Sequence, residues 1–454
     1  MAANPIAPKI VGIIGSANAG PTFGLQLLSH PILASRFKSI IFDKSAALPS
    51  SSSDKGHGSI LPSAGAAVAL FSNGLFPLYN LNLRAPLDVA SSEMSCLTLH
   101  KLTWNQELQT GARAIERQTL QRLLVSEYLQ RGGEVQWGKN AVSFSRQDSG
   151  QIRVLFSDGT DAVVDLLVGA DGGFSTVRKF ILNERNPSTA EARWLPDFMG
   201  MSGFYGISTP TQALAETRAD PQTKESTHAI WLDNGNLSVA PLPDGKVRWD
   251  LMISEKTPPD STGPVEPSSA ETSDSSEPWE TAIMPGMYPR SSSVEVLRKH
   301  AEIYHPVVET FGKLLESAER IIRSPLRQRV WTEEEIQYEN VALIGDAARL
   351  MLPSSGQGTG FAVEDATVLA NTLLNHTSAG GAVSNIRAAL EEYAVLRVPR
   401  SKKMALVASI AGRVGIGEQW YLRALRDWVR ELRVKQGKES WPFNERLKFE
   451  LARN

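Results

Sequence analysis

The stretch VGIIGSANAGPTFGLQLL, residues 11–28, joins an apolar run to a glycine turn and then to a pattern typical of a helix. A dinucleotide-binding βαβ unit begins in this way, with the spacing G-x-G-x-x-G. Here Gly15 and Gly20 keep the outer positions, and Ala17 stands at the middle one. The glycines let the backbone turn tightly, so that the helix amides point at a pyrophosphate. The turn therefore predicts dinucleotide binding, with Ala17 as a departure from the usual spacing.

An acidic residue follows at the distance that such a unit requires. Residues 9–15 and 39–43 have the short apolar runs of buried strands, and residues 20–30 between them have helical spacing. Asp43 ends the second run, 23 residues after Gly20. An acid about 20 residues beyond the turn holds a ribose hydroxyl of the dinucleotide. Strand, turn, helix, strand and acid together support the prediction.

The composition excludes several other classes of function. The chain has 454 residues, enough for two domains or for one domain with a second embedded in it. Its formal net charge of −2, with no basic stripe, argues against nucleic-acid binding. Cys96 is the single cysteine, so no internal disulfide forms and we expect a reducing, cytoplasmic location. The scattered histidines predict no metal site, and no apolar run is long enough for a transmembrane helix.

The pattern along the chain predicts an α/β fold with an inserted sheet. Residues 114–131 have apolar side chains at helical spacing, and residues 164–173 form an apolar run that ends in a glycine turn. From about 180 to 330, alternating segments such as residues 236–242 and 246–254 predict an antiparallel sheet. A strand at 340–348 and a helix at 362–374 then return to the α/β pattern.

These segments divide the chain into three parts. We expect a discontinuous, Rossmann-like dinucleotide-binding domain of residues 1–180 and 330–375, and an inserted antiparallel β-sheet domain of residues 181–329 that binds the substrate. Residues 256–278 are rich in Pro, Ser and acids, which predicts a flexible insertion. Residues 376–454 have the amphipathic pattern of C-terminal helices.

Two further motifs lie in the predicted α/β part. The first is Gly169-Ala170-Asp171-Gly172, followed by Ser175 and Arg178. The second is Gly345-Asp346-Ala347-Ala348, followed by Pro353, by Gly356-Gln357-Gly358 and by Glu364-Asp365-Ala366. By composition each is only a strand, a turn and the start of a helix. Asp171 and Asp346 could each be a turn residue or a helix cap.

Together with the N-terminal turn, these stretches closely resemble the FAD-dependent, aromatic-hydroxylase-type (group A) monooxygenases, in particular the fungal ones of secondary metabolism. The resemblance runs nearly the full chain, in the right order and at the right intervals. It includes an Arg-x-x-Leu element, Arg117 and Leu120, and the stretch of residues 65–81. The family's fold is the expected one, so the resemblance and the pattern agree.

The resemblance implies roles for individual residues. Asp346 would bind the ribityl or ribose part of FAD, and the loop from Pro353 to Gly360 would pass along the isoalloxazine ring. Arg117 would reach the FAD phosphates or ribose, while Asp171 would sit near the pyrophosphate and help reduced nicotinamide approach. NADPH would be the co-substrate, without a second glycine-rich fold of its own. The cofactor-binding residues so implied are Gly15, Ala17, Gly20, Asp43, Arg117, Asp171, Gly345, Asp346, Pro353, Gly356, Gly358 and Gly360.

The departures from the family pattern leave two functions open. Ala17 places a methyl group where the backbone normally touches the pyrophosphate, Asn18 and Pro21 are unusual in that turn, and Arg349 stands where the family usually has His. Either FAD still binds and the protein is an FAD- and NAD(P)H-dependent monooxygenase that hydroxylates or epoxidises a small natural-product intermediate. Or the flavin is lost, and the pocket acts as a cyclase or isomerase by proximity and orientation. A binding or regulatory protein is a third class, against which the intact Gly356–Gly358 loop argues.

The substrate, a small molecule, is specified weakly by the sequence. Candidate pocket residues on the predicted sheet are Tyr205, Trp231 and Arg248, with Trp249 beside the last of them. Each could equally be a packing or surface residue. Because side chains alternate along a strand, Arg248 and Trp249 face opposite sides of the sheet, and only one of them can line the pocket.

Overall fold

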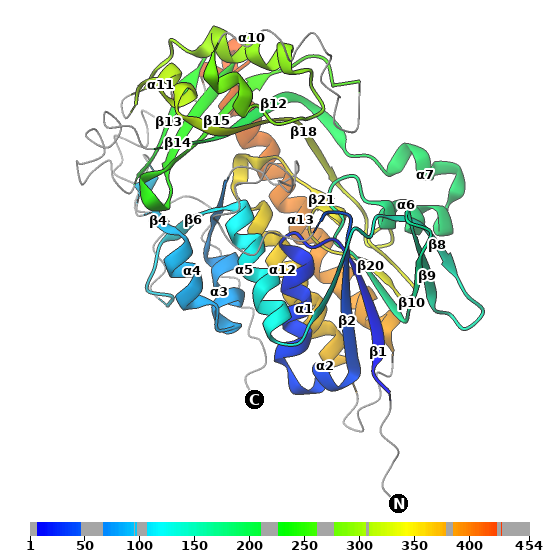
Figure 1. Cartoon of the computed structure of the whole chain (residues 1–454). Helices are drawn as coiled ribbons and strands as arrows, with labels where there is room; N and C mark the ends of the chain where they lie inside the picture. The colour runs from blue at the N-terminus through cyan, green and yellow to red at the C-terminus, as the bar shows by residue number, and fades with distance from the viewer. Residues whose placement is uncertain are drawn as a thin grey trace, which may run out of the picture.

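The computed structural model describes residues 7–46, 67–94, 96–97, 107–209, 226–260, 277–305, 308–377, 385–424 and 428. These residues build two principal sheets with helices around them, the α/β part below and the inserted sheet above in Figure 1. Most of the predicted insertion at 256–278 falls on residues 261–276, outside the described ranges, as does most of the chain after residue 424. Within the described ranges, no helix combines the length and hydropathy that crossing a bilayer needs.

The α/β part is built on a six-stranded sheet in the order β19-β20-β11-β1-β2-β7. Its strands pair in parallel except β19, which is antiparallel at one edge. Strands covered on both faces need apolar side chains on both. In β1 and β11, Val11 and Val168 are buried on one face, and Ile14 and Leu167 are buried on the other. The strands are β1 (Lys9–Ile14), β2 (Phe37–Asp43), β7 (Glu134–Trp137), β11 (Leu166–Gly169), β19 (Gln337–Tyr338) and β20 (Val341–Leu343).

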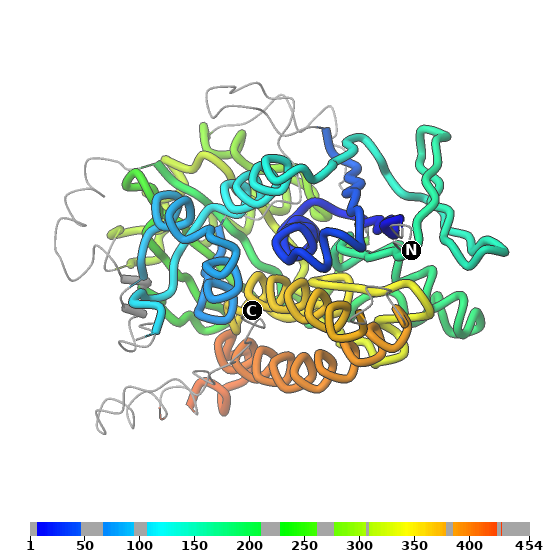
Figure 2. The backbone as a smooth tube through the Cα atoms, turned by 90° about the horizontal axis from the view of Figure 1, so that it is seen from below, coloured from blue at the N-terminus to red at the C-terminus, as the bar shows by residue number. Residues whose placement is uncertain are grey.

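Three helices stack side by side against this sheet. Figure 2 shows α12 (Gly358–Asn375) lying between α1 (Ala19–Ser29) and α13 (Ile386–Ile416). Gln26 of α1 donates from Nε2 to Thr367 Oγ1 of α12 at 3.0 Å, inside this stack. On its other side α1 meets α5 (Arg117–Gln130), so closely that a Cβ on Gly24 would lie 2.5 Å from the ring of Tyr128. Because neighbours cover it on several sides, α1 is apolar nearly all round.

Smaller elements complete this part. A three-stranded sheet of β3 (Ala67–Leu70), β6 (Ala112–Glu116) and β4 (Ser92–Met94) adjoins α3 (Ser72–Asn80) and α4 (Arg84–Ala90). An antiparallel meander of β8 (Ala141–Arg146), β9 (Ile152–Phe156) and β10 (Asp161–Val164) leads into β11, after which come α6 (Thr176–Arg185) and α7 (Pro187–Arg193). Two short elements are α2 (Pro31–Arg36), which lies between α1 and β2, and the 3₁₀ turn η3 (Gly345–Ala347), which follows β20.

The inserted sheet has seven strands in the order β21-β18-β12-β15-β14-β13-β5. Its five long strands are antiparallel neighbours: β12 (Asp197–Ser208), β13 (Ser226–Leu232), β14 (Gly235–Pro241), β15 (Val247–Ser254) and β18 (Ala318–Val330). The two edge strands come from elsewhere in the chain, β5 (Cys96–Leu97) and β21 (Arg349–Leu350). The sheet is therefore joined to the α/β part at both edges.

The two faces of this sheet pack against different partners. One face carries Phe204, Trp249 and Leu251 into a core with α10 (Arg290–His300), α11 (Phe311–Glu316) and the 3₁₀ turn η2 (Pro278–Ala282). The opposite face turns toward the α/β part, where Tyr205 packs with Phe71 in one apolar cluster and with Leu352 in another. Alternation along β12 and β15 thus places Tyr205 and Trp249 on opposite faces, because Trp249 pairs with Gly206 and not with Tyr205.

The predicted fold class is confirmed, whereas three element boundaries are wrong. The α/β sheet, the inserted antiparallel sheet and a C-terminal helix are all present. The helix predicted at 114–131 begins at Arg117, because residues 112–116 pair with β3 and β4 as strand β6. The short run of residues 112–116 is compatible with both the helical and the strand period of apolar residues, and its pairing with β3 and β4 shows that it is a strand. The strand predicted at 340–348 ends at Leu343, because residues 345–347 form η3, and the helix predicted at 362–374 begins at Gly358. The division into parts at residues 180, 330 and 375 stays a prediction.

Replacing Trp249 by alanine tests the core of the inserted sheet. Trp249 is fully buried, stacks edge-on against Phe311 at 4.9 Å between ring centroids, and donates from Nε1 to Ser208 Oγ at 2.9 Å. We expect Trp249→Ala to lower the free energy of unfolding by about 3–5 kcal/mol. The matched control is Trp420→Ala, an exposed tryptophan, for which a change within about 0.5 kcal/mol is expected. Denaturant unfolding measures both, and equal effects of the two substitutions would contradict the packing described.

Candidate functional site

The N-terminal glycine turn is held by contacts that only glycine permits. Gly15 has φ +108°, and a Cβ there would lie 2.4 Å from the carbonyl oxygen of Ala170, in the second motif. A Cβ on Gly20 would lie 2.1 Å from the carbonyl oxygen of Gly15. The turn is therefore folded back against the start of α1 and pressed against the turn after β11, as the G-x-G-x-x-G spacing requires.

Side chains fix this turn from two directions. The Ser16 amide donates to Asp43 Oδ2 at 2.6 Å, and Gln121 of α5 donates from Nε2 to the Ser16 carbonyl at 3.0 Å. Asp43 Oδ1 also accepts from the Ser45 amide at 2.8 Å. Each carboxylate oxygen of Asp43 thus has one backbone partner and a second lone pair free for a ligand hydroxyl. None of these contacts involves the methyl group of Ala17.

The start of α1 leaves its first amides without side-chain partners. Asn18 is the N-cap residue, and its side chain makes no capping bond. Asn18 Oδ1 is buried and has no hydrogen-bond partner among the described residues. The GD turn lies directly beside this helix start, since a Cβ on Gly345 would be 3.1 Å from that of Ala19. Uncapped amides at a helix start, next to a second glycine turn, suit an anionic pyrophosphate.

In the second motif, Asp171 acts on the helix that follows it. Its Oδ2 accepts from the amides of Thr176 and Val177, at 2.7 and 3.2 Å, and from Thr176 Oγ1 at 3.0 Å. The helix-cap interpretation of this aspartate therefore accounts for Oδ2. Asp171 Oδ1 is buried and has no partner among the described residues. That second oxygen is the atom available for the role that the resemblance implies.

Arg178 ties the second motif to the third. Its guanidinium is fully buried, stacks on Trp331 at 3.7 Å, and donates to the carbonyl oxygens of Gly173, Ala347 and Trp194 at 2.5, 2.8 and 2.6 Å. Burial lowers the pKa of Arg178 to about 9, opposed chiefly by the charge of Asp171. Since Ala347 lies in the GD turn, this single side chain sets the spacing between the two motifs.

Asp346 is a half-buried carboxylate without a donor among the described residues. It lies in η3, and none of those residues donates a hydrogen bond to its side chain. Burial raises the pKa of Asp346, and the nearby charge of Arg117 is the largest effect in the opposite direction. Arg117 itself forms no ion pair with the described residues. A desolvated carboxylate without donors is costly, so hydroxyl groups of a ligand are the partners that fit it.

The loop after the GD turn serves partly to pack helices. Pro353 opens the 3₁₀ turn η4 (Pro353–Ser355), and Gly356 has φ +64° beside the ring of Phe71. Gly358 begins α12 with open space where its Cβ would be. Gly360 lies inside α12, where a Cβ would be 2.6 Å from the amide of Asn73, so this glycine lets α12 approach α3. Within this loop, Gly358 at the uncapped start of α12 is therefore the position that faces open space.

A buried charge network, which the sequence patterns did not reveal, anchors the GD turn. Asp365 is fully buried and accepts from the Gly345 amide at 2.8 Å, from Arg349 at 2.5 Å and from Arg397 Nε at 2.6 Å. Arg349, a departure from the family pattern, is thus one arm of this network. The neighbouring Glu364 accepts from Arg400, with both contacts at 2.8 Å. The adjacent acids Glu364 and Asp365 inside an apolar helix were the available signal, because buried acids require partners.

The candidate substrate residues fall at two different places. Tyr205 lies on the face toward the α/β part, directly across from Asp250, and burial raises its pKa. Arg248, on the same face, is ion-paired with Asp250, a residue that the sequence did not single out. Trp231 contacts α13, since a Cβ on Gly415 would lie 3.0 Å from its ring. The structure therefore brings Tyr205 and Arg248 together around Asp250.

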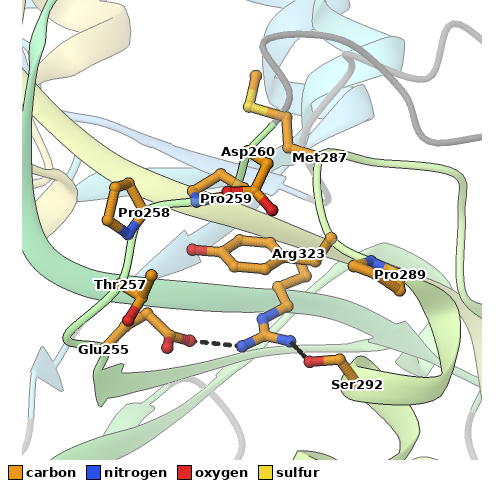
Figure 3. Close-up of a pocket in the computed structure, with 10 residues that line it drawn as sticks. Glu255, Thr257, Pro258, Pro259, Asp260, Met287, Pro289, Ser292 and Arg323 are labelled. Carbon is orange, nitrogen blue, oxygen red and sulfur yellow. Dashed lines mark hydrogen bonds and ion pairs between the residues drawn. The ribbon is translucent and has the colours of Figure 1, made fainter.

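A separate cavity of about 400 Å³ lies on the other face of the inserted sheet. Figure 3 shows Arg323 in it, donating to Glu255 at 2.6 Å and to Ser292 at 2.9 Å. Arg323 pairs across the sheet with Phe204, whose side chain belongs to the core beneath α10 and α11. Burial raises the pKa of the neighbouring Tyr288 to about 12. The sheet thus separates this cavity from the glycine turns.

Comparisons with known proteins agree with this geometry. The family described as an FAD binding domain matches residues 285–406. Salicylate hydroxylase of Pseudomonas putida is 28% identical over 279 residues, covering 59% of this chain and 56% of that enzyme. The FAD-dependent monooxygenase dmxR9 of Cryptosporiopsis is 28% identical over 306 residues, covering 64% of this chain and 52% of that protein. The chain thus aligns with little more than half the length of these relatives.

Solved structures show the same fold over nearly the whole chain. The structure of Klebsiella pneumoniae HpxO complexed with FAD and uric acid has a TM-score of 0.67 at 19% identity, covering 94% of this chain and 95% of that one. A salicylate hydroxylase substrate complex has a TM-score of 0.62 at 22% identity, covering 95% of each chain. The fold and the three turns define a flavin-binding α/β protein with an inserted sheet. The domain match and these relatives support the resemblance of the chain to the FAD-dependent, aromatic-hydroxylase-type monooxygenases.

Asp365→Asn tests the network that anchors the GD turn. The substitution keeps the shape of the side chain but leaves the buried guanidiniums of Arg349 and Arg397 without a charged partner at this position. We expect a loss of about 3–5 kcal/mol in the free energy of unfolding. The control is Glu339→Gln, which removes a partner of Arg387 at the surface and is expected to change stability by less than about 1 kcal/mol. If Asp365→Asn unfolds like the control, the network does not anchor the turn.

Asp346→Asn tests the carboxylate that lacks a protein donor among the described residues. Loss of its charge-assisted hydrogen bonds to flavin hydroxyls should weaken FAD binding about tenfold to a hundredfold. Titration of the flavin-free protein with FAD, followed by quenching of flavin fluorescence, measures this. Asp158→Asn, an exposed acid near β9, serves as the control and should bind FAD like wild type. Unchanged affinity in Asp346→Asn would show that this residue does not contact the cofactor.

Proposed function

We propose that the protein is an FAD- and NADPH-dependent monooxygenase that hydroxylates or epoxidises a small natural-product intermediate. The observation that carries the proposal is the meeting of three glycine turns around a carboxylate, Asp346, that has no donor among the described residues. The names of its relatives support the reaction class, since they include a salicylate hydroxylase, dmxR9 and the FAD-dependent monooxygenase janM of Penicillium janthinellum.

The residues around the turns fit FAD in its usual orientation. The uncapped start of α1 would face the pyrophosphate, Asp43 would accept from the adenosine ribose, and Asp346 would accept from the ribityl chain. Arg117 would balance the charge of Asp346 or reach a phosphate. Bound FAD supplies the electron transfer from NADPH to dioxygen, and the protein positions the substrate and excludes water around it.

Ala17 does not argue for a flavin-free protein. The close packing at Gly15 and Gly20 and the hydrogen bonds of Ser16 hold the backbone of the turn in place. The methyl group of Ala17 therefore does not displace that backbone. A flavin-free cyclase, the alternative left open by the sequence, would leave the half-buried carboxylate of Asp346 without a donor among the described residues. Such a carboxylate is retained where a ligand satisfies it. We therefore favour the monooxygenase.

The face of the inserted sheet indicates the kind of substrate. Arg248 and Asp250 form a pair without net charge, on the face that also carries Tyr205. Because Asp250 already balances the charge of Arg248, a carboxylate substrate gains little from binding there. A hydroxyl group can donate to a free lone pair of Asp250, and a carbonyl group can accept from an N–H group of Arg248. We therefore propose a neutral, oxygen-bearing aromatic substrate. Tyr205 and Arg248 would contact it, and Trp231 would close the edge nearest α13. A cytoplasmic location, where NADPH is available, belongs to the same proposal.

Anaerobic reduction by NADPH tests the proposed function even while the natural substrate is unidentified. Mixing the FAD-loaded protein with NADPH should bleach the flavin absorption bands, and admitting oxygen should restore them. Hispidin, a neutral probe chosen because one relative is named hispidin-3-hydroxylase, should accelerate the bleaching more than the anionic probe salicylate. Asp250→Asn, which frees Arg248, should reduce that preference. A flavin that NADPH leaves oxidised, with either probe present, would contradict the proposal.

A further inference from the structure

Among the described residues, large exposed apolar side chains recur on α13 and just after it. On α13, Leu406 and Ile410 are 62% and 55% exposed, and just beyond it Trp420 and Tyr421 are 74% and 52% exposed. We call these four residues the C-terminal apolar surface. Single exposed apolar residues are ordinary, but such a group of large side chains marks an interaction site.

Helix α13 has two distinct faces. Its inner face is lined by small residues: a Cβ on Gly412 would lie 3.0 Å from Leu352, and one on Gly415 would meet Trp231. Leu406 and Ile410 are four residues apart and therefore lie on one side of the helix, away from that packing. Figure 2 shows α13 as the outermost of the three stacked helices. The fold thus presents the apolar surface outward at its own edge.

The same segment carries a concentrated positive charge. Between Tyr393 and Gly417 there is no acidic residue, whereas Lys402, Lys403 and Arg413 are exposed on α13. Lys402 has Glu333 at 3.8 Å, but more than half of its side chain stays exposed. Residues 393–454 contain 14 Lys+Arg and 6 Asp+Glu, against 33 and 43 in residues 1–392. A chain of net charge −2 therefore has a strongly basic end. Such asymmetry points to an anionic partner for that end.

The charges argue against two other occupants of this surface. A second copy of the chain related by a two-fold axis would bring the basic face of Lys402, Lys403 and Arg413 against an identical basic face. The chain's own residues 429–454 contain 7 Lys+Arg and 4 Asp+Glu, so they too carry the same sign. Neither occupant neutralises the basic side chains beside the apolar ones.

We propose that the C-terminal apolar surface docks in the plane of an anionic lipid bilayer. Trp and Tyr prefer the level of the lipid headgroups. Helices with Leu and Ile on one side and Lys or Arg beside them lie in that interface and bind more strongly when lipids are anionic. This inference rests on α13 and the segment after it, and does not depend on the proposed function.

Co-sedimentation of the FAD-loaded, full-length protein with vesicles tests the proposal. Binding to phosphatidylcholine vesicles that contain phosphatidylserine should exceed binding to pure phosphatidylcholine by about tenfold or more, and salt should weaken it. Leu406→Gln with Ile410→Gln, and separately Lys402→Gln with Arg413→Gln, should each reduce binding to near the level seen with neutral vesicles. The matched control is Val142→Gln with Leu155→Gln, two exposed apolar residues on β8 and β9, which should bind like wild type.

Each alternative has its own result. Equal binding to neutral and anionic vesicles, or no binding to either, overturns the proposal. Loss of binding in the control double variant as well would show a general effect of removing apolar side chains, and also overturns it. Light scattering that shows a dimer, abolished by Leu406→Gln with Ile410→Gln, would assign the surface to a second copy instead. Flavin content and circular dichroism of every variant show that the fold is kept.

Discussion

The buried carboxylate of Asp365 is the constraint on which the cofactor site depends. It accepts the Gly345 amide, and so fixes the GD turn from behind, while Arg349 and Arg397 balance its charge. Buried charges are tolerated only when partners and hydrogen bonds are complete, so α12, α13 and the turn must come together as one unit. That unit places Asp346 beside the start of α1 with its carboxylate free. The family fold and the candidate flavin site therefore share one electrostatic anchor.

The sequence predicted the parts of the site that backbone geometry decides. Glycine is required at positions 15 and 20 because a Cβ there would lie less than 3 Å from a backbone oxygen. A requirement of this kind appears in the sequence as a fixed spacing of glycines. Side-chain partnerships across the fold are not visible in that way. Arg349 looked like a departure until its partner Asp365, sixteen residues on, was placed beside it. Asp250 was missed because a single acid in an alternating strand has no pattern, and β6 was missed because its short alternating run fits two periods.

The two faces of the inserted sheet divide its tasks. One face fills a core beneath α10 and α11 with Trp249 and Phe204, and the other presents Tyr205 and the Arg248–Asp250 pair to the flavin-binding part. Alternation along β15 produces both from adjacent residues. Because β21 follows directly after the GD turn and joins the edge of this sheet, the chain itself positions the face that carries Tyr205 relative to the turn.

The central claim is that the chain holds FAD although Ala17 replaces the middle glycine of its first turn. The most direct measurement is the visible absorption spectrum of the purified protein after incubation with FAD and removal of the excess. The account predicts flavin bands shifted from those of free FAD, at about one flavin per chain, and the same ratio for Ala17→Gly. A protein that stays colourless, while Ala17→Gly retains the flavin, would contradict it.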